Sequence, residues 1–147
     1  MKQVLFLCTG NYYRSRYAEI MFNVLAPRAG LTHKAFSRGL APSPLNVGPM
    51  SQHTIEALTK LGIEHAEHLR DPIDVTAADF DKAQLTIAVK EAEHRPLMQR
   101  RFPTLVDRVE YWHVDDLDYA DPSIALPHLD ALLASLITRL KNNSQAV

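Results

Sequence analysis

The sequence predicts an α/β fold, a three-layer sandwich with a four-stranded parallel sheet as its middle layer. Short apolar runs alternate with stretches of helical spacing, which is typical of βαβ units. The first run, Val4 to Leu7, is continuously apolar, as expected of a strand that is buried on both faces. The length of 147 residues suits one compact domain, so we expect a single domain over 1–147.

The first part of the chain predicts two strands separated by a helix. Residues 4–7 form the first strand, and residues 15–29 follow with apolar side chains at helical spacing. Gly30 marks the end of that helix, because glycine is favoured just beyond a helix terminus. Residues 34–40 predict the second strand, and residues 41–49, which hold three prolines, predict a loop.

The middle of the chain predicts a second helix, a short helical turn and the third strand. Pro49 favours a helix start at that position, and Gly62 favours its end. Thr76 is a candidate N-cap for a short turn that runs through Phe80. Residues 84–89 predict the third strand, because they again form a short apolar run.

The last part of the chain predicts two helices and the fourth strand. Residues 90–101 have a helical pattern, in which Pro96 indicates an early break or a late start. Residues 108–114 predict the fourth strand, and residues 115–123 predict an acidic loop. A leucine-rich helix then extends to about Lys141.

Composition excludes several classes of protein. A net charge of −1 argues against a nucleic-acid or membrane partner that is bound through bulk charge. The single cysteine excludes an internal disulfide, and no continuous apolar run approaches the roughly 20 residues that span a bilayer. His65 and His68 have the spacing of metal ligands on a helix, but no third ligand lies nearby, so we expect no metal site. The apolar run at the N-terminus is too short for a signal peptide, so we expect a cytoplasmic protein with a reduced Cys8.

The loop after the first strand has the pattern of an oxyanion site. Ligands of parallel sheets bind beyond the carboxyl ends of the strands, which directs attention to the loops after Leu7, Leu40, Val89 and Val114. A loop between a strand and a helix N-terminus can turn successive backbone amides inward around a tetrahedral anion. The first of these loops reads Cys8, Thr9, Gly10, Asn11, Tyr12, Tyr13, Arg14 and Ser15.

Three side chains of this loop can support nucleophilic chemistry. Cys8 stands at the base of the loop and faces a helix N-terminus, which favours the thiolate. The planar guanidinium of Arg14 can bind two phosphoryl oxygens, and Ser15 can hydrogen-bond the sulfur. The competing interpretation is that a lone cysteine at a strand end is a small buried hydrophobic residue.

Residues 4–15 resemble the phosphate-binding signature of the low-molecular-weight protein tyrosine phosphatases, Cys-x5-Arg followed by Ser or Thr. Arsenate reductases of the same fold share this first loop. The resemblance extends over nearly the whole chain. Later stretches are similar to the family's second loop and helix, its third strand and the strand end that carries its acid: Asn46–Gly48 with the helix that ends at Leu61–Ile63, Gln84–Val89, and Trp112–Asp116.

The resemblance implies a hydrolase of phosphoric monoesters that needs no metal or organic cofactor. Cys8 would attack phosphorus and form a cysteinyl-phosphate, while Arg14 and the loop amides hold the transferring group. Asn11 would brace the loop, and Ser15 would assist departure of the thiolate. The expected substrate is a phosphorylated protein or a small aryl phosphate. The residues expected to bind it are Thr9, Gly10, Asn11, Tyr12, Tyr13 and Ser15.

The general acid has two candidates. In the resembling family it is an Asp at the end of the fourth strand, usually followed by Pro. The position relative to Trp112–Val114 selects Asp116, whereas the dipeptide Asp121-Pro122 selects Asp121. We favour Asp116, because register relative to a strand fixes position in space, while Asp-Pro is also a common turn. Asp115 and Asp118 would then solvate the loop.

Besides Leu117, which follows Asp116 where the family usually has Pro, the sequence departs from the family at four positions. Tyr13 stands where a second cysteine is frequent, so no protective disulfide can form within the chain. Tyr12 replaces an aliphatic residue, and Arg16 stands where proline is common. Leu45 occupies the place of an aromatic wall, which weakens the support for selectivity toward phosphotyrosine.

Two alternative functions remain open at this stage. An arsenate reductase would use the same loop but would need an external thiol or redoxin to release arsenite. A non-catalytic oxyanion-binding module would keep the loop and lack a working acid. The sequence makes no prediction of the oligomeric state.

Overall fold

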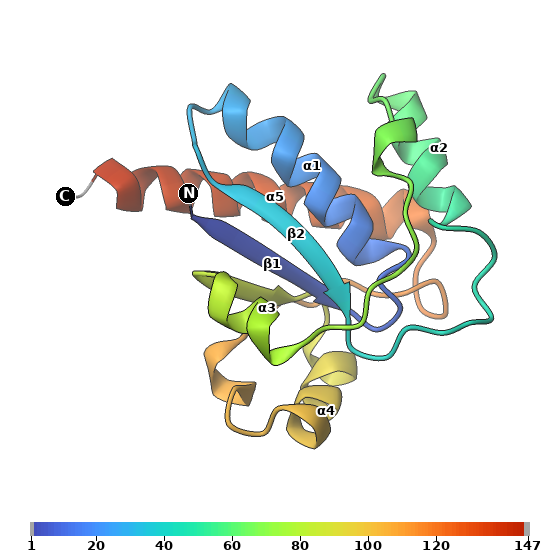
Figure 1. Cartoon of the computed structure of the whole chain (residues 1–147). Helices are drawn as coiled ribbons and strands as arrows, with labels where there is room; N and C mark the ends of the chain where they lie inside the picture. Colours follow the sequence, from blue (N-terminus) through green and yellow to red (C-terminus); the bar gives the residue numbers. More distant parts are fainter. Residues whose placement is uncertain (1, 146–147) are drawn as a thin grey trace.

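The computed structural model describes residues 2–145 as a central sheet between two layers of helices (Figure 1). Helices α1, α2 and α5 lie on one side of the sheet, and α3 and α4 lie on the other. The three-layer prediction is therefore confirmed. In chain order the elements are β1 (Gln3–Cys8), α1 (Arg14–Arg28), β2 (Lys34–Gly39), α2 (Gln52–Lys60), η1 (Ala66–His68), α3 (Ala77–Lys82), β3 (Leu85–Ala88), α4 (Glu91–Arg101), η2 (Val106–Arg108), β4 (Glu110–Tyr111) and α5 (Pro122–Gln145).

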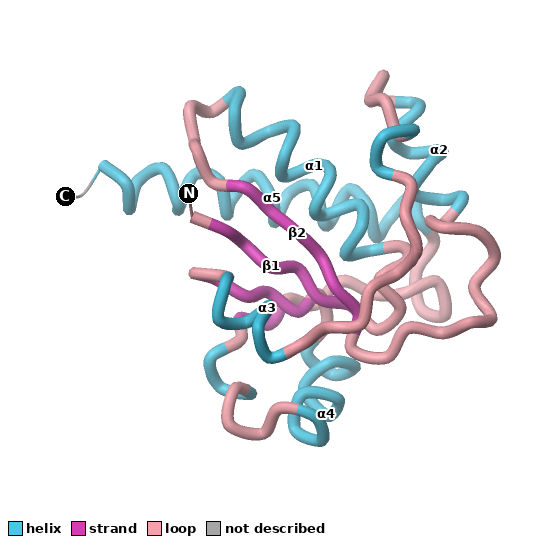
Figure 2. Tube along the Cα trace, in the orientation of Figure 1, coloured by secondary structure: helices cyan, strands magenta, loops and turns pink. Residues whose placement is uncertain are grey.

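The sheet has four parallel strands in the order β2-β1-β3-β4. Strand β1 lies in the centre, where Val4 pairs with Ala35 of β2 and with Leu85 of β3. Because all strands run the same way, the loops that follow them gather at one end of the sheet (Figure 2). This end therefore brings together the loops after β1, β2, β3 and β4.

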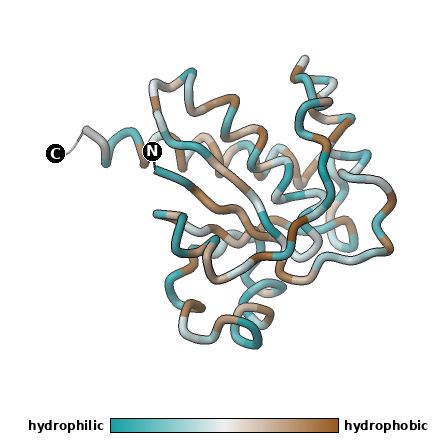
Figure 3. Tube along the Cα trace, in the orientation of Figure 1, coloured by the Kyte–Doolittle hydropathy of each residue, from teal (hydrophilic) through white to brown (hydrophobic). Residues whose placement is uncertain are grey.

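Strand β1 explains why the core divides into two clusters. Its side chains alternate between the two faces, so Phe6 belongs to the cluster under α1 and α5, and Leu5 to the cluster under α3 and α4. The ring of Phe6 packs 6.0 Å from that of Phe22 and 5.8 Å from that of Trp112, measured between centroids. Much of β1 has the hydrophobic colour in Figure 3, as its burial on both faces requires.

Helix α5 is long and apolar enough over Pro122–Asn143 to cross a membrane, judged by length and composition alone. Its apolar side chains have another explanation in this fold. Leu129, Leu133 and Leu136 are buried in the same cluster as Phe22 of α1. Helix α5 thus packs along α1 as a core helix.

Most element boundaries match the sequence prediction, and two details of the predicted helices are wrong. Helix α2 begins at Gln52 instead of Pro49, because the Ser51 hydroxyl accepts a hydrogen bond from the backbone N–H of His53 and caps the helix there. Helix α4 runs through Pro96 without a break. Burial of Met98 on α4 shows that tertiary packing offsets the hydrogen bond that proline cannot donate.

Of two other predictions at element ends, one is confirmed and one is confirmed in part. Thr76 forms the predicted N-cap of α3, in a capping box with Asp79. The predicted fourth strand is real but shorter, because only Glu110–Tyr111 is regular strand. Beyond it, the backbone N–H of Val114 still donates to the carbonyl of Val89, at 2.8 Å, so the chain stays beside β3 as it approaches the site.

Candidate active site

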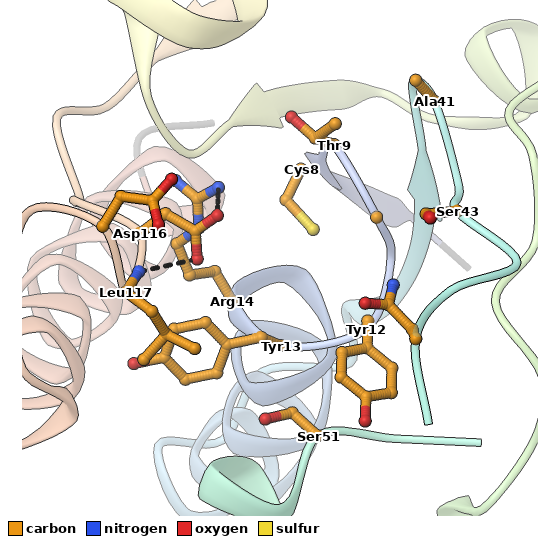
Figure 4. A pocket seen from close by; sticks show the side chains of 13 residues that line it. Cys8, Thr9, Tyr12, Tyr13, Arg14, Ala41, Ser43, Ser51, Asp116 and Leu117 are labelled. Carbon is orange, nitrogen blue, oxygen red and sulfur yellow. Dashed lines mark hydrogen bonds and ion pairs between the residues drawn. The ribbon is translucent and has the colours of Figure 1, made fainter. Parts of the chain in front are cut away.

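The loop between β1 and α1 forms the floor of a cavity of about 300 Å³ at the carboxyl end of the sheet. Figure 4 shows Cys8 in the centre of this cavity, with Arg14 and Asp116 on one side and Tyr12 on the other. The loop contributes most of its residues to the lining, and the rest come from the loops after β2 and β4. The lining residues are Cys8, Thr9, Gly10, Tyr12, Tyr13, Arg14, Ala41, Ser43, Asn46, Ser51, Asp116, Leu117 and Asp118.

Asn11 gives the loop its tight curve. It adopts a left-handed backbone conformation with φ of 51°, which asparagine tolerates better than most residues. This conformation turns its backbone N–H inward, where it donates to Cys8 Sγ at 3.2 Å. Cys8 is a buried free cysteine, and the Ser15 hydroxyl lies 2.9 Å from its sulfur. Two polar groups therefore converge on the sulfur atom.

The side chain of Asn11 fastens the loop to its surroundings. Its Nδ2 donates to the hydroxyls of Ser15 and Ser37, both at 3.0 Å. Its Oδ1 accepts from Arg70 Nη1 and from the backbone N–H of Ile73, also at 3.0 Å. Because Asn11 is completely buried, every polar atom of its side chain is satisfied inside the protein.

Arg14 lies almost fully buried at the side of the cavity. Its Nη1 donates to the carbonyl of Val114 at 2.9 Å, and its Nη2 lies 2.7 Å from Glu93 and 3.3 Å from Asp116. Burial lowers the pKa of Arg14, but the nearby Cys8 and the Glu93 carboxylate raise it, and the net direction is upward. The guanidinium is therefore a fixed cation beside the sulfur.

Glu93 is a further member of the site, outside the residues that the sequence analysis selected. It lies in the first turn of α4 and accepts hydrogen bonds from Arg14, from the Thr9 hydroxyl and from His94 Nε2. Burial alone raises the pKa of Glu93, but these hydrogen bonds outweigh it and hold the pKa well below its usual range. Its position in the first turn of the helix that follows the carboxyl end of β3 is the sequence signal that could have identified it.

His94 completes this arrangement from inside the protein. Its Nδ1 accepts from the backbone N–H of Lys90 at 3.0 Å, which leaves the ring proton on Nε2. Nε2 lies 3.2 Å from the Thr9 hydroxyl and 3.0 Å from Glu93. Burial is the largest influence on His94 and lowers its pKa, which favours this neutral form.

The two candidate acids occupy different places. Asp116 lines the cavity next to Leu117, with its carboxylate directed at Arg14 (Figure 4). Asp121 is outside the lining of this cavity, at the start of α5, where its Oδ1 accepts from the backbone N–H of Ser123 at 2.9 Å. That hydrogen bond lowers the pKa of Asp121. Asp121 thus occupies the place of a helix cap.

The wall opposite Arg14 consists of polar side chains. The Tyr12 hydroxyl donates to the carbonyl of Val47, which joins the loop between β1 and α1 to the loop after β2. Asn46 lines the cavity, whereas Leu45 is 88% exposed and is not part of the lining. Residues 2–145 contain no group of three or more His, Cys, Asp or Glu side chains arranged to hold a metal ion.

Known proteins of similar sequence and structure identify the family of this chain. The sequence model of the family described as low molecular weight phosphotyrosine protein phosphatase matches residues 3–146. The chain belongs to this family. It is also 32% identical, over 95% of its length and 97% of the relative, to a protein of Bacillus subtilis named protein-arginine-phosphatase.

Solved structures give the same fold with similar chain lengths. A mutant of YwlE from Bacillus subtilis superimposes with a TM-score of 0.79 at 27% identity, covering 96% of this chain and 99% of that one. A low molecular weight protein tyrosine phosphatase from T. tengcongensis gives a TM-score of 0.75 at 25% identity, covering 97% and 99%. As a member of this phosphatase family, the chain is a hydrolase of phosphoric monoesters.

Proposed function

We propose that the chain dephosphorylates phosphotyrosine-type monoesters through a cysteinyl-phosphate intermediate on Cys8. The observation that carries this proposal is the placement of the sulfur at the base of the cavity, within hydrogen-bond reach of Asn11 N–H and the Ser15 hydroxyl. Arg14 lines the same cavity and supplies a cation for the phosphoryl oxygens. A structure of the YwlE arginine phosphatase, in a cysteine-to-serine mutant, carries a phosphorylated active-site serine, which supports attachment of phosphate at this place.

The first chemical step transfers the phosphoryl group to sulfur. The Cys8 thiolate attacks phosphorus while the bond from phosphorus to the ester oxygen breaks. Protonated Asp116 gives its proton to the departing oxygen, which leaves as an alcohol or phenol. Arg14 and the loop amides hold the three equatorial oxygens throughout, so the charge that develops on them is stabilised by donors already in place.

The second step returns the enzyme to its starting state. The Asp116 carboxylate takes a proton from water, and the water oxygen attacks phosphorus. The bond between phosphorus and sulfur breaks, inorganic phosphate forms, and Cys8 departs as a thiolate. The Ser15 hydroxyl, 2.9 Å from the sulfur, stabilises that thiolate as the leaving group. The proton that Asp116 gives to the leaving oxygen is thus replaced by one from water, and the phosphoryl group ends on the water oxygen.

The intermediate can be tested by trapping. Mixing the protein with p-nitrophenyl phosphate and quenching in acid should add one phosphoryl group to the peptide that contains Cys8, as seen by mass spectrometry. Cys8→Ser should abolish turnover of this substrate. Arg101→Lys serves as a control that keeps wild-type turnover, because Arg101 ends α4, on the other side of the sheet from α1. Turnover by Cys8→Ser at the wild-type rate would contradict the mechanism.

Phosphoarginine is a second candidate substrate. The curated relative is named protein-arginine-phosphatase, and the cavity is lined by the carboxylates Asp116 and Asp118, which can attract a guanidinium group. One assay distinguishes the two candidate substrates: kcat/KM is measured on one peptide that carries either phosphotyrosine or phosphoarginine.

We propose the cytoplasm as the site of action, because the only cysteine must remain a thiol.

A further inference from the structure

Arg16 is a buried arginine outside the lining of the cavity, and its side chain holds three segments around the site. Its side chain lies in the first turn of α1 and is 1% exposed. Nη1 lies 3.3 Å from the carbonyl oxygen of Asn11, 2.9 Å from that of Pro49 and 3.1 Å from that of Arg70. Nη2 donates to the carbonyl of His68 at 2.8 Å. One side chain thus connects the phosphate loop (residues 8–15), the loop after β2, and the segment that runs from η1 to Arg70.

The surroundings of Arg16 disfavour the charged form of its guanidinium group. Its hydrogen bonds within residues 2–145 all go to backbone carbonyls and none to a carboxylate. Burial and the neighbouring Arg70 lower its pKa to about 10. A cation near a helix N-terminus also opposes the helix dipole. A buried charge without a paired carboxylate is costly, so its presence here indicates a compensating role.

The carbonyls of the phosphate loop suggest what this role is. In a trans peptide the C=O bond and the N–H bond of the next residue point in opposite directions. A donor that holds a loop carbonyl on the outside therefore aims the following amide toward the inside. Four loop carbonyls have such outside donors from the backbone or a hydroxyl: Cys8 O from Leu40 N at 2.9 Å, Thr9 O from Ala41 N at 2.9 Å, Tyr12 O from Ser51 N at 2.9 Å, and Tyr13 O from Thr54 Oγ1 at 3.1 Å.

The Asn11 carbonyl has the same arrangement with a different donor. Its outside partner is the guanidinium of Arg16, so Arg16 controls the peptide between Asn11 and Tyr12. We propose that Arg16 is a positioning residue that aims the Tyr12 amide at the phosphoryl group and keeps the anion-binding shape of the loop. This inference rests on the proposed function, in which the phosphoryl group binds inside the loop. The charge of Arg16 also adds to the positive field behind the loop.

The inference can be tested with inorganic phosphate as the probe. Arg16→Met keeps a long side chain but removes the charge and every donor. Because a charge-assisted hydrogen bond is lost, we expect the Kd for phosphate and the KM for p-nitrophenyl phosphate to rise by roughly 10-fold. Phosphate binding is measured by calorimetry at a temperature well below the unfolding midpoint, so that only folded protein contributes.

A matched variant separates this role from general stability. Arg101 also binds carbonyls, those of Leu40 and Val75, but none of its hydrogen bonds or ion pairs goes to residues 8–15. Arg101→Met should lower the unfolding midpoint and leave the Kd for phosphate within about 2-fold of wild type, because the loop keeps its donors. An Arg16→Met protein that is less stable but binds phosphate as wild type does would overturn the inference.

A second variant tests the role of Arg16 in phosphate binding if Arg16→Met does not fold. Arg16→Lys keeps the charge but replaces the planar fork with a single ammonium, which cannot reach all four carbonyls. We expect a Kd for phosphate that is roughly 3-fold weaker than in wild type, and an unchanged Kd would overturn the inference. Phosphate binding needs no turnover. A wild-type protein that binds phosphate without hydrolysing esters would therefore refute the proposed function and leave this test intact.

Discussion

The carboxylate of Asp116 lies 3.3 Å from Nη2 of Arg14, although the two residues come from opposite ends of the chain. The same guanidinium donates to the carbonyl of Val114, two residues before Asp116. Arg14 therefore fixes both the backbone and the side chain at the start of the acidic loop. This double contact brings a carboxylate to the edge of the proposed phosphoryl site, where an acid for the leaving oxygen is needed.

The first prediction concerns Asp116. Asp116→Asn removes the proton donor but keeps a polar side chain of the same size. We expect kcat for an alkyl phosphate ester to fall by roughly 100-fold or more, because general acid catalysis contributes most when the leaving group is poor. Steady-state kinetics over a pH series measures this, and the fall of kcat toward high pH, where a general acid loses its proton, should disappear.

Asp121→Asn is the matched control for this prediction. Asparagine caps helices as well as aspartate does, so α5 should keep its first turn. We expect kcat within about 2-fold of wild type, since Asp121 is bonded to Ser123 and does not line the cavity. A large loss of kcat in Asp121→Asn alone would transfer the acid role to Asp121.

The second prediction concerns Ser15. Ser15→Ala removes the hydroxyl that lies 2.9 Å from the Cys8 sulfur. The thiolate then departs less readily from phosphorus, so hydrolysis of the intermediate should slow by roughly 10-fold. Stopped-flow measurement with p-nitrophenyl phosphate should show a larger burst followed by a slower steady state.

Ser37→Ala provides the comparison for Ser15. The Ser37 hydroxyl accepts from the same Asn11 amide group but has no contact with sulfur. Its loss should change the loop's stability without enlarging the burst. Equal bursts in the two variants would show that Ser15 acts through the loop and not on the sulfur.

The fold was predictable because it depends on local patterns. A continuous apolar run produces a central strand such as β1, and the position of Gly30 after α1, with φ of 81°, is what a helix end requires. The loop from Cys8 to Ser15 was predictable for the same reason, since a strand, a glycine and a helix start are adjacent in sequence. These features need no knowledge of distant residues.

The partners of the loop could not be read from the sequence because they are distant in the chain. Glu93 reaches Arg14 across 79 positions, and Arg70 reaches Asn11 across 59. Neither side chain carries a local motif, and each is brought to the loop by the order of the strands. Arg16 was visible as an unusual residue, but its four carbonyl partners follow only from the packing of the loops.

The third prediction concerns the acid stability of the protein. The pKa of Glu93 in the folded state lies below its usual value of 4.5, so the unfolded state takes up the proton first as the pH falls. The stabilisation by Glu93 is complete above about pH 4.5 and declines as the pH drops further. Glu93→Gln should lower the free energy of unfolding by about 1–2 kcal/mol at pH 7, and this difference should shrink toward pH 3.

Urea denaturation at several pH values measures this difference directly. Asp107→Asn serves as the comparison, because Asp107 pairs with Arg95 but is 89% exposed. An ion pair in water contributes little, so this variant should follow the wild-type curve at every pH. A constant difference between wild type and Glu93→Gln across the pH range would contradict the assigned role of the charge.

The fourth prediction concerns the hydroxyl of Tyr13, which differs from that of Tyr17 in one respect. Tyr13 is 5% exposed, and its hydroxyl has no hydrogen-bond partner within residues 2–145. Burial, together with the nearby Asp116, raises its pKa to about 12. Tyr17 is also buried, but its hydroxyl donates to Asp130 Oδ1 at 2.8 Å.

The two tyrosines should therefore respond to phenylalanine with opposite signs. Tyr13→Phe removes an unsatisfied polar atom, so we expect the free energy of unfolding to rise by about 1 kcal/mol and the midpoint by roughly 3 °C. Tyr17→Phe deprives Asp130 of its donor and should destabilise the protein by about 1–2 kcal/mol. Thermal denaturation of both variants decides the question. If Tyr13→Phe is destabilised as much as Tyr17→Phe, the Tyr13 hydroxyl has a hydrogen-bond partner in solution, and its assignment as an unsatisfied group is wrong.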